Sequence, residues 1–543
     1  MGDMGKNPAD RNSNGSFVSA AFILGVASLL SRLVGLVRER VFTTQFGAGD
    51  TFDAFVAAFR IPDAIFNLVV IGALSAAFIP LFTEKLVKHR DAKDAFAFAS
   101  SILNLIMVAV ALLGLVYALT APWLVPLITP GFSGEKLELT IMLSRIMALQ
   151  PIILAISFVA SGVLNSFKRF VAYALAPISY NIGIIFGVLY LVPMIGPAGL
   201  GWGVVIGAFL HVAVQLPSLW AVGFRWQGIF ISSWTDIKSI WMMLLPRVFG
   251  LAAQQVNLLT VTVLGSGLLA GSISAFYLAN NIQYVPVGIF GLAFAQAVFP
   301  TLAEQIARGE KKQFRNTLTK TFRYVLFLVI PTSVFFFLLR AQIVRVLFGD
   351  GAFDWQDTIM TFETFGALTI SIFAQATIPL LTRAFYVQQD TKTPVIISVL
   401  SIALNVGLAL WLAPRMGVQG LAVAFSASAI FNLLLLLGTL HWQLDGFNDK
   451  EVLTSVARIS LATVLGGAVL QILKVPIALV VNMERFWGVA TQLGVTFLAG
   501  LGIYFVACYL MKSPELAVIR KYLPRRFKLK AGLETPRFGG LLE

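Results

Sequence analysis

The sequence predicts an all-α polytopic membrane protein, and three observations support this fold class. Of the 543 residues, 58% are hydrophobic and only 12% are charged, whereas soluble domains carry about 25% charged residues. The mean hydropathy of +0.85 is too high for a chain that folds in water. The apolar residues occur in runs of about twenty or more, as in membrane-spanning helices, whereas barrel strands would alternate apolar and polar residues.

Composition also excludes several kinds of site. The single cysteine, Cys508, cannot form an intramolecular disulfide, and three histidines without paired spacing argue against a histidine metal centre. We therefore expect no cofactor and no metal. The net charge of +14 indicates basic cytoplasmic loops that face anionic membrane lipids, rather than binding of nucleic acid.

Fourteen apolar stretches follow a polar N-terminal tail, residues 1–16. The first stretch is too long for the apolar region of a signal peptide, so we expect it to be retained as the first helix. The stretches are 17–37, 52–82, 96–127, 138–164, 171–193, 199–223, 238–264, 272–302, 321–345, 358–386, 394–413, 418–440, 455–476 and 487–511.

Charge predicts how these spans are oriented. An even number of spans places both termini on one side of the membrane. With that side cytoplasmic, its segments hold 28 of the 40 lysines and arginines, and the opposite side holds eight. Cytoplasmic loops carry the excess of basic residues in membrane proteins. The sequence therefore predicts fourteen spans with both termini in the cytoplasm.

The chain also contains an internal duplication. AGDTFDAF (48–55) matches AGSISAF (270–276), which aligns Asp53 with Ser274, and further similar segments recur at an offset of about 221 residues. Two parallel repeats of six helices predict two pseudo-symmetric lobes around a cavity, the architecture of an alternating-access carrier. The expected domains are the N-lobe (17–225), the C-lobe (236–442), an appendage of two helices (455–511) and a basic cytoplasmic tail (512–543).

Ionisable residues inside spans cost about 2.5–3.5 kcal/mol each on insertion scales and mark candidate sites. The first predicted span with its outer end, and the second span, carry a cluster of such residues and one serine: Ser31, Arg32, Arg38, Glu39, Arg40, Asp53, Arg60 and Asp63. One interpretation is a cationic cavity whose guanidinium groups bind an anionic headgroup. Two others stay open: Arg38 and Arg40 could extend toward water at the end of the first span, and Asp53 could form a structural ion pair with Arg60.

Four motifs give the chain a resemblance to a known family: SRLVGLVRER (31–40), FGAGDTFDAFVAAFRIP (46–62), AAFIP (76–80) and RAFYVQQDTKTP (383–394). Together they resemble the MurJ/MviN family of lipid II flippases, which is related to multidrug (MATE-type) and polysaccharide exporters. The resemblance implies a bacterial inner-membrane protein, with no enzymatic activity, that moves undecaprenyl-pyrophosphate-linked peptidoglycan precursor to the outer leaflet. It also implies that the last two helices help to form a groove for the lipid tail.

The resemblance carries over to individual residues. It implies that the substrate site contains Arg32, Arg38, Glu39, Asp53 and Arg60, and the polar cluster adds Ser31. The chain departs from the family at Phe66, Ile71 and Asn281, where well-studied members carry an arginine, a glutamate and an arginine. Fewer cations would then face the headgroup, so the binding mode and the exact glycan stay open.

A lipid II flippase that works as a monomer is therefore the leading hypothesis. The sequence indicates no nucleotide-binding domain, so we expect the membrane potential or an ion gradient to drive transport, the coupling ion being unknown. The alternatives are an exporter of another lipid-linked oligosaccharide, or a MATE-type small-molecule exporter, whose cationic cargo would favour an acidic cavity. A membrane-embedded transferase would need a catalytic His or carboxylate pair, and a scaffold for cell-wall enzymes would not need a charged cavity.

Overall fold

The computed structural model describes residues 8–71, 78–88, 92–230, 252, 255–444 and 446–516, with side chains from residue 26 onward. Within these ranges the chain forms helices and loops and no strand. Most of the tail 512–543, much of the span predicted at 238–264 and part of the motif 76–80 lie outside the described residues. The all-α prediction is confirmed.

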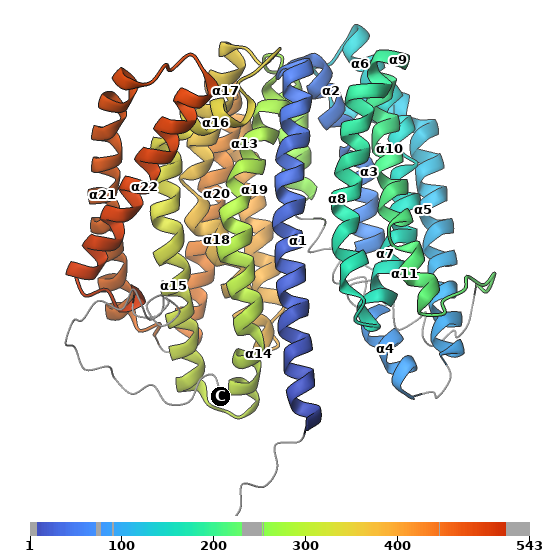
Figure 1. The fold of residues 1–543 in the computed structure, drawn as a ribbon, viewed down its shortest axis with the longest axis horizontal. Helices are drawn as coiled ribbons and strands as arrows, with labels where there is room; N and C mark the ends of the chain where they lie inside the picture. Colours follow the sequence, from blue (N-terminus) through green and yellow to red (C-terminus); the bar gives the residue numbers. More distant parts are fainter. Residues whose placement is uncertain are drawn as a thin grey trace, which may run out of the picture.

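The first half of the chain forms one group of helices, at the right in Figure 1 except for α1. Its elements are α1 (Pro8–Phe46), α2 (Asp50–Ala58), α3 (Arg60–Ile65), the π-helix η1 (Phe66–Ile71), α4 (Ile79–Lys88), α5 (Lys93–Ile128), α6 (Gly134–Met147), α7 (Gln150–Ser166), α8 (Phe170–Phe186), the π-helix η3 (Gly187–Leu191), α9 (Val192–Ile195), α10 (Ala198–Ala213) and α11 (Leu216–Ala221).

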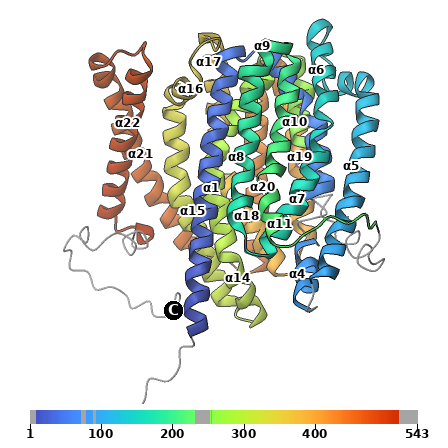
Figure 2. The ribbon, with the colours of Figure 1, turned by 45° about the vertical axis from the view of Figure 1, so that its right-hand side comes forward.

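The second half forms a similar group, followed by two helices at its outer edge (Figures 1 and 2). Its elements are the helix Gln255–Ser266, α13 (Ser272–Pro286), the π-helix η4 (Val287–Leu292), α14 (Ala293–Ala307), α15 (Lys311–Leu338), α16 (Arg340–Phe348), α17 (Trp355–Thr369), α18 (Ile372–Val387), α19 (Lys392–Met416), α20 (Val418–Gln443), α21 (Asp449–Val480) and α22 (Phe486–Leu510).

Among the described residues, eleven helices are long and apolar enough to cross a membrane, or twelve if α17 and α18, which meet at a 45° bend, form one span. The count of fourteen stays a prediction. The span predicted at 52–82 is divided into α2, α3, η1 and α4, whose described parts end at residue 71 and resume at 78. A continuous apolar run therefore identified the membrane segment but not its breaks.

The duplication is visible in the local structure. Two π-helices, η1 at Phe66–Ile71 and η4 at Val287–Leu292, lie 221 residues apart, the offset that the repeated motifs predict. Each follows a helix that contains a proline, Pro62 in α3 and Pro286 at the end of α13, and a proline removes a backbone donor from the helical ladder. Equivalent positions in the two lobes thus interrupt their helices in the same way, which supports the two pseudo-symmetric lobes.

The hydrogen bonds of α1, α15, α16 and α22 fix which helix ends lie together. Arg40, near the end of α1, donates to Val346 O at 2.8 Å, and Arg345 donates to Met483 O in the α21–α22 loop at 3.0 Å. At the other end of the bundle, Glu515 follows α22 and accepts from Arg323, in the first half of α15, at 2.9 Å, and Arg323 also donates to Glu451 in the first turn of α21. The start of α1 and the end of α22 therefore lie at the same end of the molecule.

Glu515 fastens the chain beyond α22 to this end of the bundle. Its carboxylate is 1% exposed and binds Arg323, Ser455 and Ser513. Burial raises the pKa of this carboxyl, but the hydrogen bonds from Ser455, Ser513 and Arg323 outweigh burial and lower the pKa below its ordinary value. The carboxylate is therefore more stable in the folded chain than in the unfolded one.

We expect this contact to make stability depend on pH. A lowered folded pKa contributes stability above the unfolded value of about 4.3, and that stability is lost as the pH falls through the folded pKa. The midpoint of thermal unfolding in detergent should therefore fall between pH 5 and pH 3, and part of that fall should be absent in Glu515→Gln. An identical pH profile for Glu515→Gln and the control Glu138→Gln, at an exposed glutamate, would contradict this assignment.

Candidate functional site

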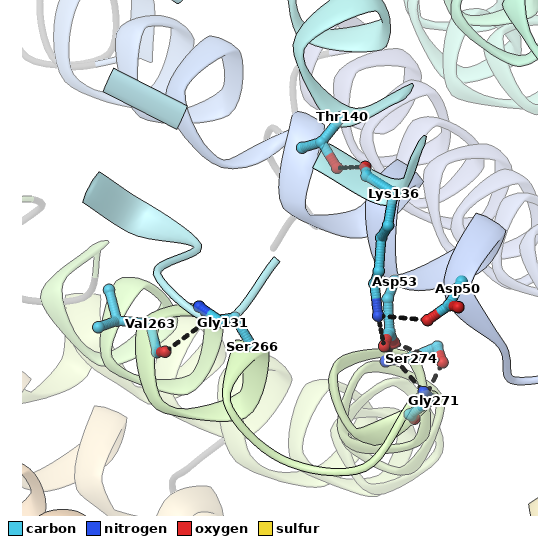
Figure 3. A network of polar contacts seen from close by, with 9 residues as sticks. All are labelled: Asp50, Asp53, Gly131, Lys136, Thr140, Val263, Ser266, Gly271 and Ser274. Carbon is cyan, nitrogen blue, oxygen red and sulfur yellow. Dashed lines mark hydrogen bonds and ion pairs between the residues drawn. The ribbon is translucent and has the colours of Figure 1, made fainter. Parts of the chain in front are cut away.

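One end of the molecule is closed by contacts between the two lobes, and Asp53 lies at their centre (Figure 3). Asp53 is 1% exposed on α2. Its carboxylate accepts hydrogen bonds from Gly271 N, Ser274 N and Ser274 Oγ at 2.8, 2.8 and 2.9 Å, and Lys136 Nζ lies 2.9 Å away. Asp53 thus caps the N-terminus of α13 in the other lobe, where free backbone N–H groups and the helix dipole favour a carboxylate.

The contacts that close this end of the molecule follow the internal duplication. Asp53 contacts Ser274, with which the repeat aligns it, 221 residues later. Gly131 N donates to Ser266 Oγ at 3.1 Å, and its counterpart at the same offset, Ala352 N, donates to Thr44 O at 2.8 Å. Contacts therefore occur in pairs that exchange the lobes, as expected where a pseudo-twofold axis passes through an interface.

The lobes approach closely enough at this end to require glycine. A Cβ atom at Gly271 would lie 1.8 Å from Ala48 O, and one at Gly351 would lie 2.3 Å from Thr44 O. Both glycines also have positive φ, +86° and +62°, which side chains rarely adopt. The described residues thus form a tight seal between backbones, which we call the seal: Thr44, Ala48, Asp53, Gly131, Lys136, Ser266, Gly271, Ser274, Gly351 and Ala352.

A second cluster joins the lobes one turn or more inside the seal. Arg38 pairs with Glu39 on α1, and Glu39 Oε1 also accepts from Tyr277 Oη at 3.0 Å and from Asn281 Nδ2 at 3.3 Å on α13. Arg38 Nη2 lies 3.1 Å from the same Tyr277 oxygen. The side chains of Arg38 and Glu39 are 18% and 5% exposed. A buried carboxylate therefore connects the arginine to the opposite lobe.

Arg32 and Arg60 also reach the opposite lobe. Arg32 lies six residues, about 9 Å, before Arg38 along α1. Its guanidinium lies against Gly288, where an added Cβ would meet Nη2 at 2.4 Å. Arg60 Nε donates to Thr262 Oγ1 at 2.7 Å. With Arg38 these residues place three guanidinium groups along one boundary between the lobes, and we call them the arginine cluster.

Two acidic residues of the N-lobe partly neutralise the positive charge of the arginine cluster. Glu39 pairs with Arg38, as described above. Asp63 lies close enough to Arg60 and Arg38 to interact electrostatically with both, and Gln150 Nε2 is 3.5 Å from its carboxylate. The arginine cluster therefore carries a net positive charge that its own lobe only partly compensates.

The structure places Asp53 and Arg60, which the sequence analysis assigned to one cluster of ionisable residues, in two different sets of contacts. The proposed ion pair of Asp53 with Arg60 does not form: Asp53 binds Lys136 and α13, whereas Arg60 binds Thr262. Asp53 therefore belongs to the seal, and Arg60 to the arginine cluster. Ser31 is half-buried beside Arg32. A role in substrate binding for Ser31, Arg32, Arg38, Glu39, Asp53 and Arg60 stays a prediction.

Several residues of this boundary are uncharged or lie in loops, and sequence reasoning missed them. Thr262 and Tyr277 lie on apolar helices and carry no charge that would single them out. Lys136 lies near the start of α6, where it resembles an ordinary loop lysine. Ser274 did carry a signal, because the repeat aligns it with Asp53.

We expect Lys136 to stabilise the folded protein through its buried partner. Its amine lies 2.9 Å from Asp53 and 2.7 Å from the exposed Asp50. Removing one partner of a buried ion pair costs about 3–5 kcal/mol. Lys136→Met should therefore lower the thermal midpoint in detergent by several degrees, whereas Lys312→Met, at an exposed lysine, should not. Equal midpoints for the two variants would show that Asp53 does not depend on this pair.

Comparisons with known proteins agree in sequence and in fold. The family described as "Lipid II flippase MurJ" matches residues 42–490. A "Probable lipid II flippase MurJ" of Vibrio cholerae serotype O1 is 31% identical over 508 residues, covering 90% of this chain and 94% of its own. Another, of Rhizobium tropici, is 28% identical over 525 residues, covering 94% and 97%.

Two solved structures resemble the fold. "Lipid II flippase MurJ, inward closed conformation" has a TM-score of 0.76 at 22% identity, covering 92% of this chain and all of its own. An inward-facing multidrug resistance MATE family transporter of the MOP superfamily has a TM-score of 0.61 at 14% identity, covering 81% and 98%. The predicted relation to the MATE fold is therefore confirmed.

Proposed function

The chain belongs to the MurJ family of lipid II flippases and translocates peptidoglycan precursor as a multi-pass inner-membrane protein, and we propose that the arginine cluster binds its cargo during alternating access. The cargo is a lipid-linked glycan with an anionic pyrophosphate. Guanidinium groups bind phosphate oxygens in pairs through fixed N–H donors. Arg32, Arg38 and Arg60 supply three such groups where the lobes meet.

The observation that carries this proposal is the double role of Glu39. It neutralises Arg38 and accepts hydrogen bonds from Tyr277 and Asn281 of the other lobe. A pyrophosphate that binds Arg38 would compete with Glu39 for the guanidinium. The carboxylate would then have to rearrange, and with it the contacts that join the lobes. Cargo binding and lobe movement are thereby coupled through one side chain.

The seal supports alternating access with this end of the molecule as one gate. With both termini in the cytoplasm, as the distribution of basic residues favours, the seal lies toward the periplasm. Opening it requires Asp53 to release the N-terminus of α13 and the paired backbone contacts to separate. The cargo would then leave toward the outer leaflet, with its isoprenoid tail in lipid beside α21 and α22.

The proposed drive is electrical. A net positive cluster that moves, or that moves an anionic cargo, responds to the membrane potential with about 2.3 kcal/mol per charge per 100 mV. The departures from the family fit a site with fewer cations. Phe66 packs its ring 5.8 Å from that of Phe158, and Asn281 supplies a neutral donor to Glu39. The remaining guanidinium groups would then carry headgroup recognition.

Competition for binding to the purified protein tests the proposed cargo contact. Labelled lipid II should be displaced by undecaprenyl pyrophosphate more effectively than by undecaprenol, because only the former offers oxygens to the arginines. Equal displacement by the two competitors would show that the isoprenoid tail alone is recognised. Displacement by a cationic drug instead would favour the multidrug alternative.

A further inference from the structure

A partly open apolar cavity lies in the first lobe, on helices that carry no member of the arginine cluster. It has a volume of about 260 Å³ and lies between α5, α7 and α11, beneath the segment that follows α11. Its walls include Leu103, Ile156, Ala160, Leu219 and Trp226. The volume is about nine times the share of one liquid water, and an apolar cavity gives water no polar partner. The cavity therefore suits a hydrocarbon group.

A strap of extended chain, residues 223–230, covers the cavity and is firmly attached to α5 (green, beyond α11 in Figure 1). Asn104 Nδ2 donates to Gln227 O and Ile229 O at 2.9 and 2.8 Å, and Asn104 Oδ1 accepts from Trp226 Nε1 at 2.8 Å. Ser101 Oγ donates to Phe230 O at 2.6 Å. These bonds satisfy three backbone carbonyls of the strap and hold it against α5, so the space beneath it is a built feature of the fold.

The edge of the cavity has the features of a membrane–water interface. Trp220 and Trp226 line it and are 56% and 64% exposed. Tryptophans concentrate at this depth because one end of the side chain is apolar and the other polar. The strap lies near the start of α5, the end of the bundle opposite the seal. The cavity is therefore within reach of the lipids of one leaflet.

Basic residues stand beside this edge. Phe224 lines the cavity and contacts the ring of Phe96, which contacts that of Phe167, with centroids 5.5 and 6.0 Å apart. Arg225 follows Phe224, and Lys168 and Arg169 follow Phe167; all three side chains are exposed. Three cations next to an apolar cavity complement a molecule with an anionic head and a hydrocarbon tail.

We propose that this cavity holds an acyl chain of an anionic phospholipid whose phosphate lies against Lys168, Arg169 and Arg225. The chain would fill the space between α5, α7 and α11 and support the strap from below. In the sequence the strap follows the last helix of the first lobe, and the bound lipid would stabilise its attachment to α5. This site is separate from the path of the transported lipid.

The proposal can be tested by photocrosslinking. The full-length protein is reconstituted in phosphatidylethanolamine vesicles that contain phosphatidylglycerol with a diazirine at the end of one acyl chain. Crosslinked peptides should come from the cavity walls of α5, α7 and α11. Ala160→Phe should abolish this labelling by filling the cavity. Leu112→Phe, on the exposed face of α5, should leave the labelling unchanged.

The headgroup contact has its own variant, which changes only exposed side chains. Replacing Lys168, Arg169 and Arg225 together by glutamine should weaken labelling by about five-fold for each charge removed. Lys311→Gln/Lys312→Gln, at exposed basic residues of the other lobe, serves as the matched control. Unchanged labelling in the triple variant, or equal labelling by a diazirine-bearing phosphatidylcholine, would overturn the anionic site. Cavity-wall labelling that persists in Ala160→Phe would overturn the cavity as the binding place.

Discussion

Arg32→Ala/Arg38→Ala is expected to abolish rescue of growth in a bacterium whose own lipid II flippase has been switched off. Each arginine offers charge-assisted hydrogen bonds to the pyrophosphate, worth about 1.5–3 kcal/mol apiece. Losing both should reduce cargo affinity by about a hundred-fold or more. The loss should be greater than for either single variant, because the two guanidinium groups lie on one helix along the same boundary.

The control for this experiment is Arg145→Ala. Arg145 lies on α6 and donates to Ala118 O at 3.1 Å, outside the arginine cluster. The Arg145→Ala variant should support growth as well as the unaltered chain does when equal amounts of the two proteins are inserted. Arg38→Lys should retain part of the activity, because it keeps the charge but loses the paired donors. Full growth of the double alanine variant would remove the arginine cluster from the mechanism.

Gly271→Ala is expected to weaken the seal more than any other single-methyl change at this end of the molecule. Its φ of +86° would cost alanine about 1–2 kcal/mol, and the new Cβ would lie 1.8 Å from Ala48 O. Relief of such a clash costs about a further 1–3 kcal/mol through displaced backbone. The state with this end closed should therefore lose population, and rescue of growth should fall.

Gly134→Ala separates the effect of backbone strain at positive φ from the effect of the steric clash. Gly134 also has positive φ, +53°, but no atom lies within 4 Å of the added Cβ. Both variants can be compared through a cysteine at Thr140, buried beside Lys136, in a Cys508→Ser background. Its reaction with a water-soluble maleimide should accelerate in Gly271→Ala and stay near the parental rate in Gly134→Ala. Equal acceleration in both would assign the effect to backbone strain alone.

The sequence predicted the architecture well, because bilayer physics leaves few alternatives. Apolar runs identified helices, and the offset of 221 residues anticipated that Asp53 and Ser274 occupy equivalent positions. The contact between Asp53 and Ser274 could not be predicted, because equivalent positions in two repeats touch only if they lie at the pseudo-twofold axis. The breaks within the second span, at Phe59 and Phe66, were not located, because Pro62 between them marks only a place where a kink is tolerated and hydropathy does not say where a helix divides.

The individual contacts of the site were harder to predict. A structural ion pair of Arg60 with Asp53 was one of the open interpretations, because seven residues place both on one helix face. The helix divides between them, at Phe59, and each residue finds a partner on the other lobe instead. Charge alone identified the members of the cluster. Their partners depend on tertiary packing, which brings neutral donors such as Thr262 and Tyr277 to them.

The appearance of lipid II in the outer leaflet shows directly whether the chain translocates this lipid by means of the arginine cluster. The chain is expressed in a bacterium depleted of its own flippase, and lipid II exposed at the outer leaflet is measured as depletion proceeds. The unaltered chain should restore exposure, and Arg32→Ala/Arg38→Ala, inserted at the same level, should not. Absence of exposed lipid II with the unaltered chain folded and inserted would contradict the account, and so would restored exposure with the double variant.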